Sequence, residues 1–350
     1  MISALILLGA SAGQGCRENS PPADRDVAAP RDAARAEEAL QAVEVWLGKG
    51  DASKARTIAE RLVDVDPASP DAREAHAITL VAVAAETAAN GDPDSATRLR
   101  TAALAQYEDA IRLSATTPRT DLLHAAGIIA ESIDREQRAL ELYAQASEGA
   151  PDEASHAIYA GNVLIKMERP AEAESWFSKA VRIDPAEPWG WAGQAVVLRQ
   201  QSRFDEALTS IQQARRSAQG RGTRNDLVFR VSEARILRES GRSEDSARLL
   251  FALDPETRAN SAAVTEELHL ACELIGRHEK SAEVWAAFHA LHPEDGEAIF
   301  MVAQSSLRAG RPEEAASWYR LASDVGMSDE RIERMKRKAQ DLVDGDRSGQ

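Results

Sequence analysis

The chain has 350 residues, of which 43% are hydrophobic and 28% are charged, and its formal net charge at pH 7 is −15. This acidic balance argues against nonspecific binding of nucleic acid, which depends on neutralising phosphates with lysine and arginine. The two cysteines are too few and too far apart for a disulfide framework.

Residues 1–16, MISALILLGASAGQGC, combine an apolar run with small residues and a cysteine. The run is too short to span a bilayer, which takes about 20 apolar residues, but it suits an export signal with a small-residue cleavage site. Alternatively, Gly15 and Cys16 resemble the end of a bacterial lipobox, in which Cys16 is lipidated. We expect a lipoprotein or exported protein of the bacterial cell envelope, with residues 17–35 as a flexible tether. A cytoplasmic chain with a frayed N-terminus is the alternative.

Helical segments follow, in a pattern that recurs about every 34 residues from 36 to 328. The copy at 36–69 is degraded, and the region 70–118 predicts an expanded hairpin that turns at Asn90 to Pro93. The copies at 120–153, 154–187 and 188–221 keep the spacing without gaps. In 227–258, Pro255 arrives about a turn early, which predicts a short second helix. The copy at 262–295 has Ser281 where the others have alanine, and 296–328 is regular again.

The copy at 154–187 shows the pattern most clearly. Its markers are small or bulky residues at helix contacts, an aromatic in the second helix and a proline at the end: Ala157, Ala160, Gly161, Leu164, Ala173, Phe177, Ala180 and Pro185. This spacing resembles the tetratricopeptide repeat. The resemblance implies an all-α fold, a right-handed superhelical solenoid of antiparallel helix pairs with about eight copies, some of them degenerate.

The last predicted helix, 329–343, places apolar residues on one face at helical spacing, with a charged opposite face. Such a helix suits a cap that covers the last repeat and presents a polar surface to water. We expect residues 344–350 to form a disordered tail.

Motifs that carry chemistry are missing from the sequence. Glycines 9, 13 and 15 have no preceding strand and no following Lys-Ser or Lys-Thr, so they do not form a phosphate loop. His289 and His292 lack a cysteine, aspartate or glutamate at matching spacing, so we interpret them as packing or surface residues. We therefore expect no catalytic residues, no metal site and no cofactor.

The resemblance implies that one face of the first helix in each repeat lines a concave groove that binds the partner. The aligned positions predict these groove residues: His124, Ile158, Asn162, Lys166, Trp189, Arg199, Arg235, Arg238, Phe300 and Gln304. The alternative is that many of them support packing or face water.

Within this set, four side chains predict a basic stripe that receives an acidic extended peptide, because arginine forks match carboxylates. They are Lys166, Arg199, Arg235 and Arg238. Trp189 and Phe300 are the expected apolar anchors, a residue type that dominates binding energy. Asn162 resembles the asparagine of repeats that clamp the terminal carboxylates of chaperones, but Ile158 stands at the clamp's lysine position, so we do not expect that specificity.

We therefore expect a noncatalytic scaffold or adaptor that binds a protein or peptide in its groove and is tethered to a membrane or exported in a bacterium. The alternative from another class is a regulatory or substrate-recognition subunit of an enzyme complex in the cytosol. No nucleic-acid partner is expected, and the oligomeric state stays open.

Overall fold

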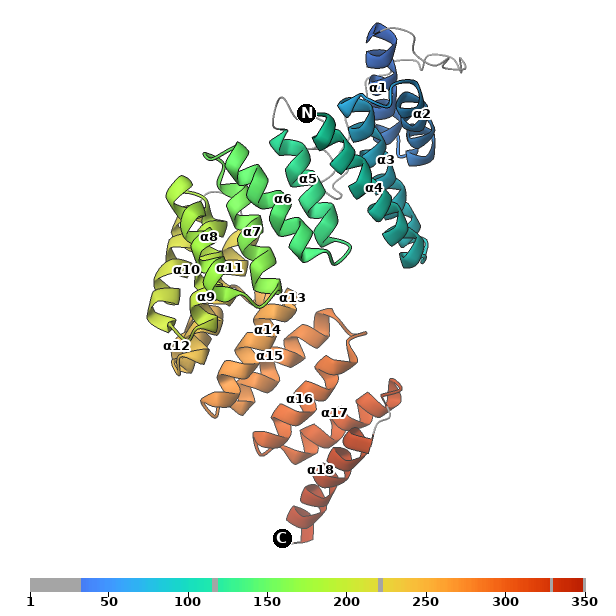
Figure 1. Cartoon of the computed structure of the whole chain (residues 1–350). Coiled ribbons are helices and arrows are strands. Elements are labelled where there is room, and N and C mark those ends of the chain that lie inside the picture. The colour runs from blue at the N-terminus through green and yellow to red at the C-terminus, as the bar shows by residue number, and fades with distance from the viewer. Residues whose placement is uncertain (1–32, 115–118, 220–222, 328–329, 349–350) are drawn as a thin grey trace. The chain divides into compact units, whose positions relative to one another are not determined.

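The computed structural model describes residues 33–114, 119–219, 223–327 and 330–348 (Figure 1). Within these ranges the chain forms eighteen α-helices and no strand, which confirms the predicted all-α fold. The predicted signal at 1–16, with Cys16, and residues 17–32 of the predicted tether lie outside the described residues. None of the described helices is long and apolar enough to cross a membrane. The chain divides into two compact units, Met1–Asp184 and Pro185–Gln350.

Unit 1 is a series of four helical hairpins. Its helices are α1 (Ala33–Gly48), α2 (Ala52–Val65), α3 (Pro70–Ala89), α4 (Pro93–Leu113), α5 (Thr120–Glu131), α6 (Glu136–Gly149), α7 (Ala154–Lys166) and α8 (Pro170–Ile183). Each hairpin packs on the next, with α2 against α3, α4 against α5, and α6 against α7. The hairpin of α3 and α4 is the longest, at 20 and 21 residues, as the expanded copy at 70–118 predicted.

Unit 2 repeats the same plan with one insertion. Its helices are α9 (Pro188–Gln200), α10 (Phe204–Ala218), α11 (Thr223–Glu239), α12 (Ser243–Phe251), α13 (Pro255–Asn260), α14 (Ala262–Leu274), α15 (His278–Leu291), α16 (Gly296–Arg308), α17 (Pro312–Asp324) and α18 (Glu330–Ser348). The short second helix predicted before Pro255 is α12, which has 9 residues. Pro255 then begins the additional six-residue helix α13, which the repeat pattern did not predict.

The turns inside the hairpins explain why the helices reverse direction so sharply. At each turn one residue adopts positive φ, for example Glu168 at 57° and Gly276 at 70°. The amide of the next residue then donates to a carbonyl five residues back, as Arg169 does to Leu164 at 2.9 Å and Arg277 to Cys272 at 2.8 Å. This Schellman arrangement satisfies the helix end in a few residues. The second helix therefore begins at once and folds back on the first.

Within a hairpin, the two helices come close enough that only a small residue fits between them. A Cβ atom on Gly161 of α7 would lie 2.7 Å from the Phe177 ring of α8, and one on Gly127 of α5 would lie 2.5 Å from the Tyr143 ring of α6. Both rings are fully buried. The glycine supplies the space and the aromatic ring fills it, so the pair sets the separation of the helices.

In one hairpin of unit 2, that of α14 and α15, a polar residue stands where α8 has Ala173. Ser281 of α15 is fully buried, and its hydroxyl lies 2.6 Å from Nδ1 of His269 and 3.0 Å from the hydroxyl of Ser305. The departure from alanine is therefore compensated by hydrogen bonds. Cys272, next to this network, is fully buried, and burial raises the pKa of its thiol to about 11.

The last helix, α18, packs on α17 with Ile332 and Ala339 buried, while Leu342 is half exposed. It runs to Ser348, whereas the sequence pattern placed its end at residue 343 and a disordered tail at 344–350. The extension carries Asp344, whose carboxylate accepts a hydrogen bond from Gln340 one turn earlier. This local hydrogen bond supports the helix beyond residue 343, where the sequence has no apolar residue. Hydrophobic periodicity therefore could not predict the extension.

The contact between Gly161 and Phe177 leads to a stability prediction. Gly161→Ala destabilises unit 1 by about 1–3 kcal/mol, because the new methyl forces Phe177 out of its place. Gly48→Ala is the matched control, since no atom lies within 4 Å of the added Cβ, and better helix propensity leaves stability unchanged or raised by up to about 1 kcal/mol. Urea unfolding followed by circular dichroism measures both. Equal midpoints for the two variants would show that the crossing is not tightly packed.

Candidate functional site

The predicted groove residues lie on the first helices of the hairpins, and the structure allows their common face to be followed within each unit. We call the side of a first helix that carries these positions the first-helix face. Unit 1 contributes His124 on α5 and Ile158, Asn162 and Lys166 on α7. Unit 2 contributes the rest: Trp189 and Arg199 on α9, Arg235 and Arg238 on α11, and Phe300 and Gln304 on α16.

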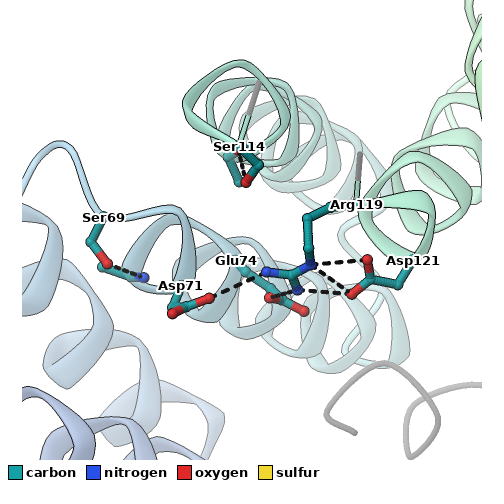
Figure 2. Close-up of polar contacts among 8 residues, drawn as sticks. Ser69, Asp71, Glu74, Ser114, Arg119 and Asp121 are labelled. Atoms are coloured by element: carbon teal, nitrogen blue, oxygen red, sulfur yellow. Dashed lines mark hydrogen bonds and ion pairs between the residues drawn. The ribbon is translucent and has the colours of Figure 1, made fainter. Parts of the chain in front are cut away.

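In unit 1, Arg119, the residue that precedes α5, connects α5 to α3 (Figure 2). Its guanidinium lies between α3 and α5, 2.7 Å from Glu74, 3.3 Å from Asp71 and 2.8 Å from Asp121. Glu74 is buried, with 7% of its side chain exposed. Asp121, and then Glu74, raise the pKa of Arg119, although burial opposes this effect. Burial raises the pKa of Glu74, because the bond to Arg119 offsets only part of the lost hydration.

The next contact joins α5 to α7 through two histidines. Nδ1 of His124 lies 3.2 Å from Nδ1 of His156, so one neutral imidazole donates to the other. The His124 ring also packs edge-on against Tyr159, with ring centroids 4.6 Å apart. Burial, and then the neighbouring His156, lower the pKa of His124 to about 4. Burial also lowers the pKa of His156, although Glu153 opposes this effect.

Lys166 closes the face of unit 1 at the C-terminal end of α7. Its ammonium lies 2.5 Å from a carboxylate oxygen of Glu131 on α5. The other oxygen of Glu131 accepts a hydrogen bond from the buried hydroxyl of Tyr143 at 3.0 Å. Lys166 is therefore an ion-pair partner of the preceding repeat.

In unit 2, ion pairs also join neighbouring first helices, at three successive contacts. Arg199 of α9 pairs with Glu239 of α11 at 2.8 Å. Arg238 and Arg235 of α11 both contact Glu267 of α14, and Arg308 of α16 pairs with Glu273 of α14. Each bond joins residues about one repeat apart in the chain, so these ion pairs connect neighbouring first helices.

The four residues of the predicted basic stripe are therefore paired with carboxylates within the fold. Each of its four members, Lys166, Arg199, Arg235 and Arg238, has a glutamate partner on a first helix of the adjacent repeat. The sequence prediction named the basic residues but not their partners, although Glu131 aligns with Arg199 and Glu239 aligns with Lys166 in the repeat. The stripe is a series of ion pairs whose cations keep part of their surface exposed.

The structure buries one predicted anchor, Phe300, and one other predicted groove residue, Ile158. Ile158 is 8% exposed, and Phe300 is 7% exposed, with its ring 6.0 Å from the ring of Tyr319. Trp189 is 42% exposed and lies edge-on against the buried ring of Phe229 at 5.0 Å. Asn162 is exposed, and Gln304 is half-buried.

Three residues of the first-helix face were not predicted from the sequence. They are large apolar side chains with substantial exposure: Val228 at 44%, Leu270 at 42% and Leu274 at 65%. The signal for two of them was present in the sequence, because Leu270 and Leu274 align with the predicted groove residues Asn162 and Lys166 of the copy at 154–187.

A metal site does not arise from these groups: in the described ranges, no cluster of three or more histidines, cysteines, aspartates and glutamates is placed to hold an ion. His289 lies edge-on against Trp318, and His292 lies against Phe288. His292 therefore packs within its repeat and His289 packs against the following one, and both fit the interpretation as packing residues.

Comparisons with known proteins agree with this architecture. The family model of the tetratricopeptide repeat matches residues 125–188 and 275–325. No curated protein matches the sequence.

Solved structures resemble the chain in fold. A tetratricopeptide repeat protein from Parabacteroides merdae has 15% identity and a TM-score of 0.50, covering 87% of this chain and 98% of that one. Yeast Tom70 has 16% identity and a TM-score of 0.50, covering 85% and 60%. Pseudomonas aeruginosa pilF has 19% identity and a TM-score of 0.48, covering 66% and 95%. At these identities the likeness to the Parabacteroides merdae protein and to Tom70 shows the fold alone.

The buried position of Glu74 leads to a prediction about Arg119. Arg119→Met removes the cation from a buried carboxylate, and we expect unit 1 to lose about 2–3 kcal/mol of stability. Adding Glu74→Gln restores most of the lost stability, because the amide carries no charge. Arg169→Met, which opens an exposed pair with Glu172, is the control and causes no measurable change. Urea unfolding of the four chains measures the effect, and a double variant no better than Arg119→Met would contradict the assignment.

The histidine pair leads to a prediction about pH. Because the folded-state pKa of His124 is lowered to about 4, the unfolded chain binds the proton more tightly. The free energy of unfolding is therefore fully retained above about pH 6.5 and falls as the pH drops toward 4. We expect His124→Phe, which keeps an aromatic ring against Tyr159, to reduce the loss between pH 7.5 and 5 by about 1–2 kcal/mol.

Thermal unfolding at both pH values measures this difference, with His292→Gln as the control at a half-buried histidine. An unchanged pH dependence in His124→Phe would show that the pair does not control acid stability.

Proposed function

Because the chain belongs to the tetratricopeptide repeat family, we propose that it is a noncatalytic scaffold that binds a protein or peptide partner on the first-helix faces of its units. One observation carries this proposal. The face combines exposed side chains, Asn162 in unit 1 and Trp189 in unit 2, with charged residues held in place by ion pairs between repeats. A surface that is already ordered loses little conformational freedom on binding.

The partner segment in this proposal is extended and acidic. The supporting observation is the difference in exposure within the ion pairs. Side-chain exposure is 46% for Arg235 and 49% for Arg308, but only 1% for Glu267 and 12% for Glu273. The arginines therefore present their outer edges to water while their carboxylate partners lie beneath. Guanidinium groups in this position complement carboxylates on an incoming chain.

The scaffold role is tested by quantitative capture from cells of the source organism. The variant Asn162→Glu with Trp189→Ala changes the first-helix face of both units and is expected to lose at least tenfold of the specifically captured protein. The matched control, Leu113→Glu with Leu291→Ala, alters exposed residues on the second helices α4 and α15 and is expected to capture as much as the native chain. Equal capture by the two variants, with native helicity in both, would remove the proposal.

We further propose that the scaffold is exported and tethered to a bacterial membrane through Cys16, on the basis of the apolar run and small residues that precede it. Membrane fractionation and intact mass of the native chain and of Cys16→Ser test this point. The proposal expects a lipidated mature chain that begins at Cys16 and sediments with membranes, and a released or unprocessed Cys16→Ser chain. A native chain of full, unmodified mass in the soluble fraction would contradict it.

A further inference from the structure

The exposed leucines of α14 form an apolar strip on the first-helix face of unit 2. Leu270 and Leu274 are one helical turn apart and are 42% and 65% exposed. At 100° per residue, Glu267, Leu270, Glu273 and Leu274 fall within a sector of about 120° of the helix. Leu270 lies near the middle of this sector, with Glu267 toward one edge and Glu273 at the other.

Ion pairs flank the strip on both sides. Glu267 accepts from Arg235 and Arg238 of α11, and Glu273 accepts from Arg308 of α16. The leucines are therefore bracketed by guanidinium groups that come from two different helices. An apolar strip with a charged rim is the composition of a protein-binding site, in which the rim excludes water from the centre.

The side of the rim that carries Glu273 is held by polar contacts within unit 2. Glu273 also contacts Nδ1 of His278 at 3.1 Å and the hydroxyl of Ser305 at 3.4 Å, and Ser305 continues to Ser281. Burial would raise the pKa of Glu273, but the hydrogen bonds from Arg308 and His278 lower it below its ordinary value. The carboxylate stays ionised at neutral pH and holds Arg308 beside the leucines.

Unit 1 has no counterpart of this strip. On its first helix α1, Val45 is 50% exposed and is the one exposed large apolar residue among the described side chains. On α3, α5 and α7 no described large apolar side chain is exposed, and the positions of Leu270 and Leu274 correspond to Asn162 and Lys166 on α7. Unit 2, by contrast, exposes four large apolar side chains on its first helices α9, α11 and α14: Trp189, Val228, Leu270 and Leu274. Among the described residues, two exposed apolar side chains one turn apart on a first helix therefore occur in unit 2 and not in unit 1.

We propose that Leu270 and Leu274, with Arg235 and Arg308 at their sides, form a subsite for a peptide segment that carries aliphatic side chains next to aspartate or glutamate. The aliphatic side chains cover the leucines, and the carboxylates reach the outer edges of the two guanidinium groups. This subsite rests on the proposed scaffold function and names the part of the partner that unit 2 recognises.

The test is a selection from a phage-displayed library of random dodecapeptides against the whole immobilised chain. We expect enriched peptides to combine leucine, isoleucine or valine with aspartate or glutamate. Their synthetic, fluorescein-labelled forms bind at least tenfold more weakly to Leu270→Ser with Leu274→Ser, and severalfold more weakly to Arg308→Gln. Leu291→Ser, at an exposed leucine of α15, leaves binding unchanged. Circular dichroism verifies the helicity of each variant.

Three outcomes would overturn the subsite. Enriched peptides that are basic, or that bind the double leucine variant as tightly as the native chain, exclude the proposed chemistry. Peptides weakened by Trp189→Ala but not by the leucine changes place recognition elsewhere on the face and leave the scaffold function standing. An empty selection rejects the subsite, whereas the scaffold function is decided separately by capture of partners from cells.

Discussion

The whole fold depends on how closely the two helices of a hairpin approach each other. Where α7 crosses α8, Gly161 leaves room for the ring of Phe177, and where α5 crosses α6, Gly127 does the same for Tyr143. A single hairpin built this way has one apolar side that no residue of its own covers, so each pair needs the next one. The stacking within each unit therefore follows from a contact of a few atoms, repeated along the chain.

Stacking alone does not orient the side chains that face outward, and the ion pairs between first helices supply that order. Arg119 with Glu74, Lys166 with Glu131, and Arg238 with Glu267 each join one repeat to its neighbour. Buried carboxylates lose hydration, so such pairs contribute little net stability. Their larger effect is to hold long, flexible side chains in one conformation. The result is a face whose charges are positioned before any partner arrives.

The repeat pattern predicted the helices because it reports local spacing. It located the expanded hairpin at 70–118 and the early Pro255, since both follow from turn residues. It did not predict the pairing of Arg199 with Glu239 or of Arg308 with Glu273, because these partners are about 40 and 35 residues apart and meet only after the repeats stack. Phe300 occupied a groove position by alignment but is buried against Tyr319, since the exact rotation of a helix depends on its neighbours.

Photo-crosslinking in living cells shows whether partners contact the first-helix face. A benzophenone amino acid is placed at Leu274 on α14 or at Leu291 on α15, both exposed and in the same unit. A partner on the first-helix face gives a discrete protein adduct from position 274 and none from position 291. An adduct from position 291 alone, or the same adduct from both positions, would contradict binding on this face.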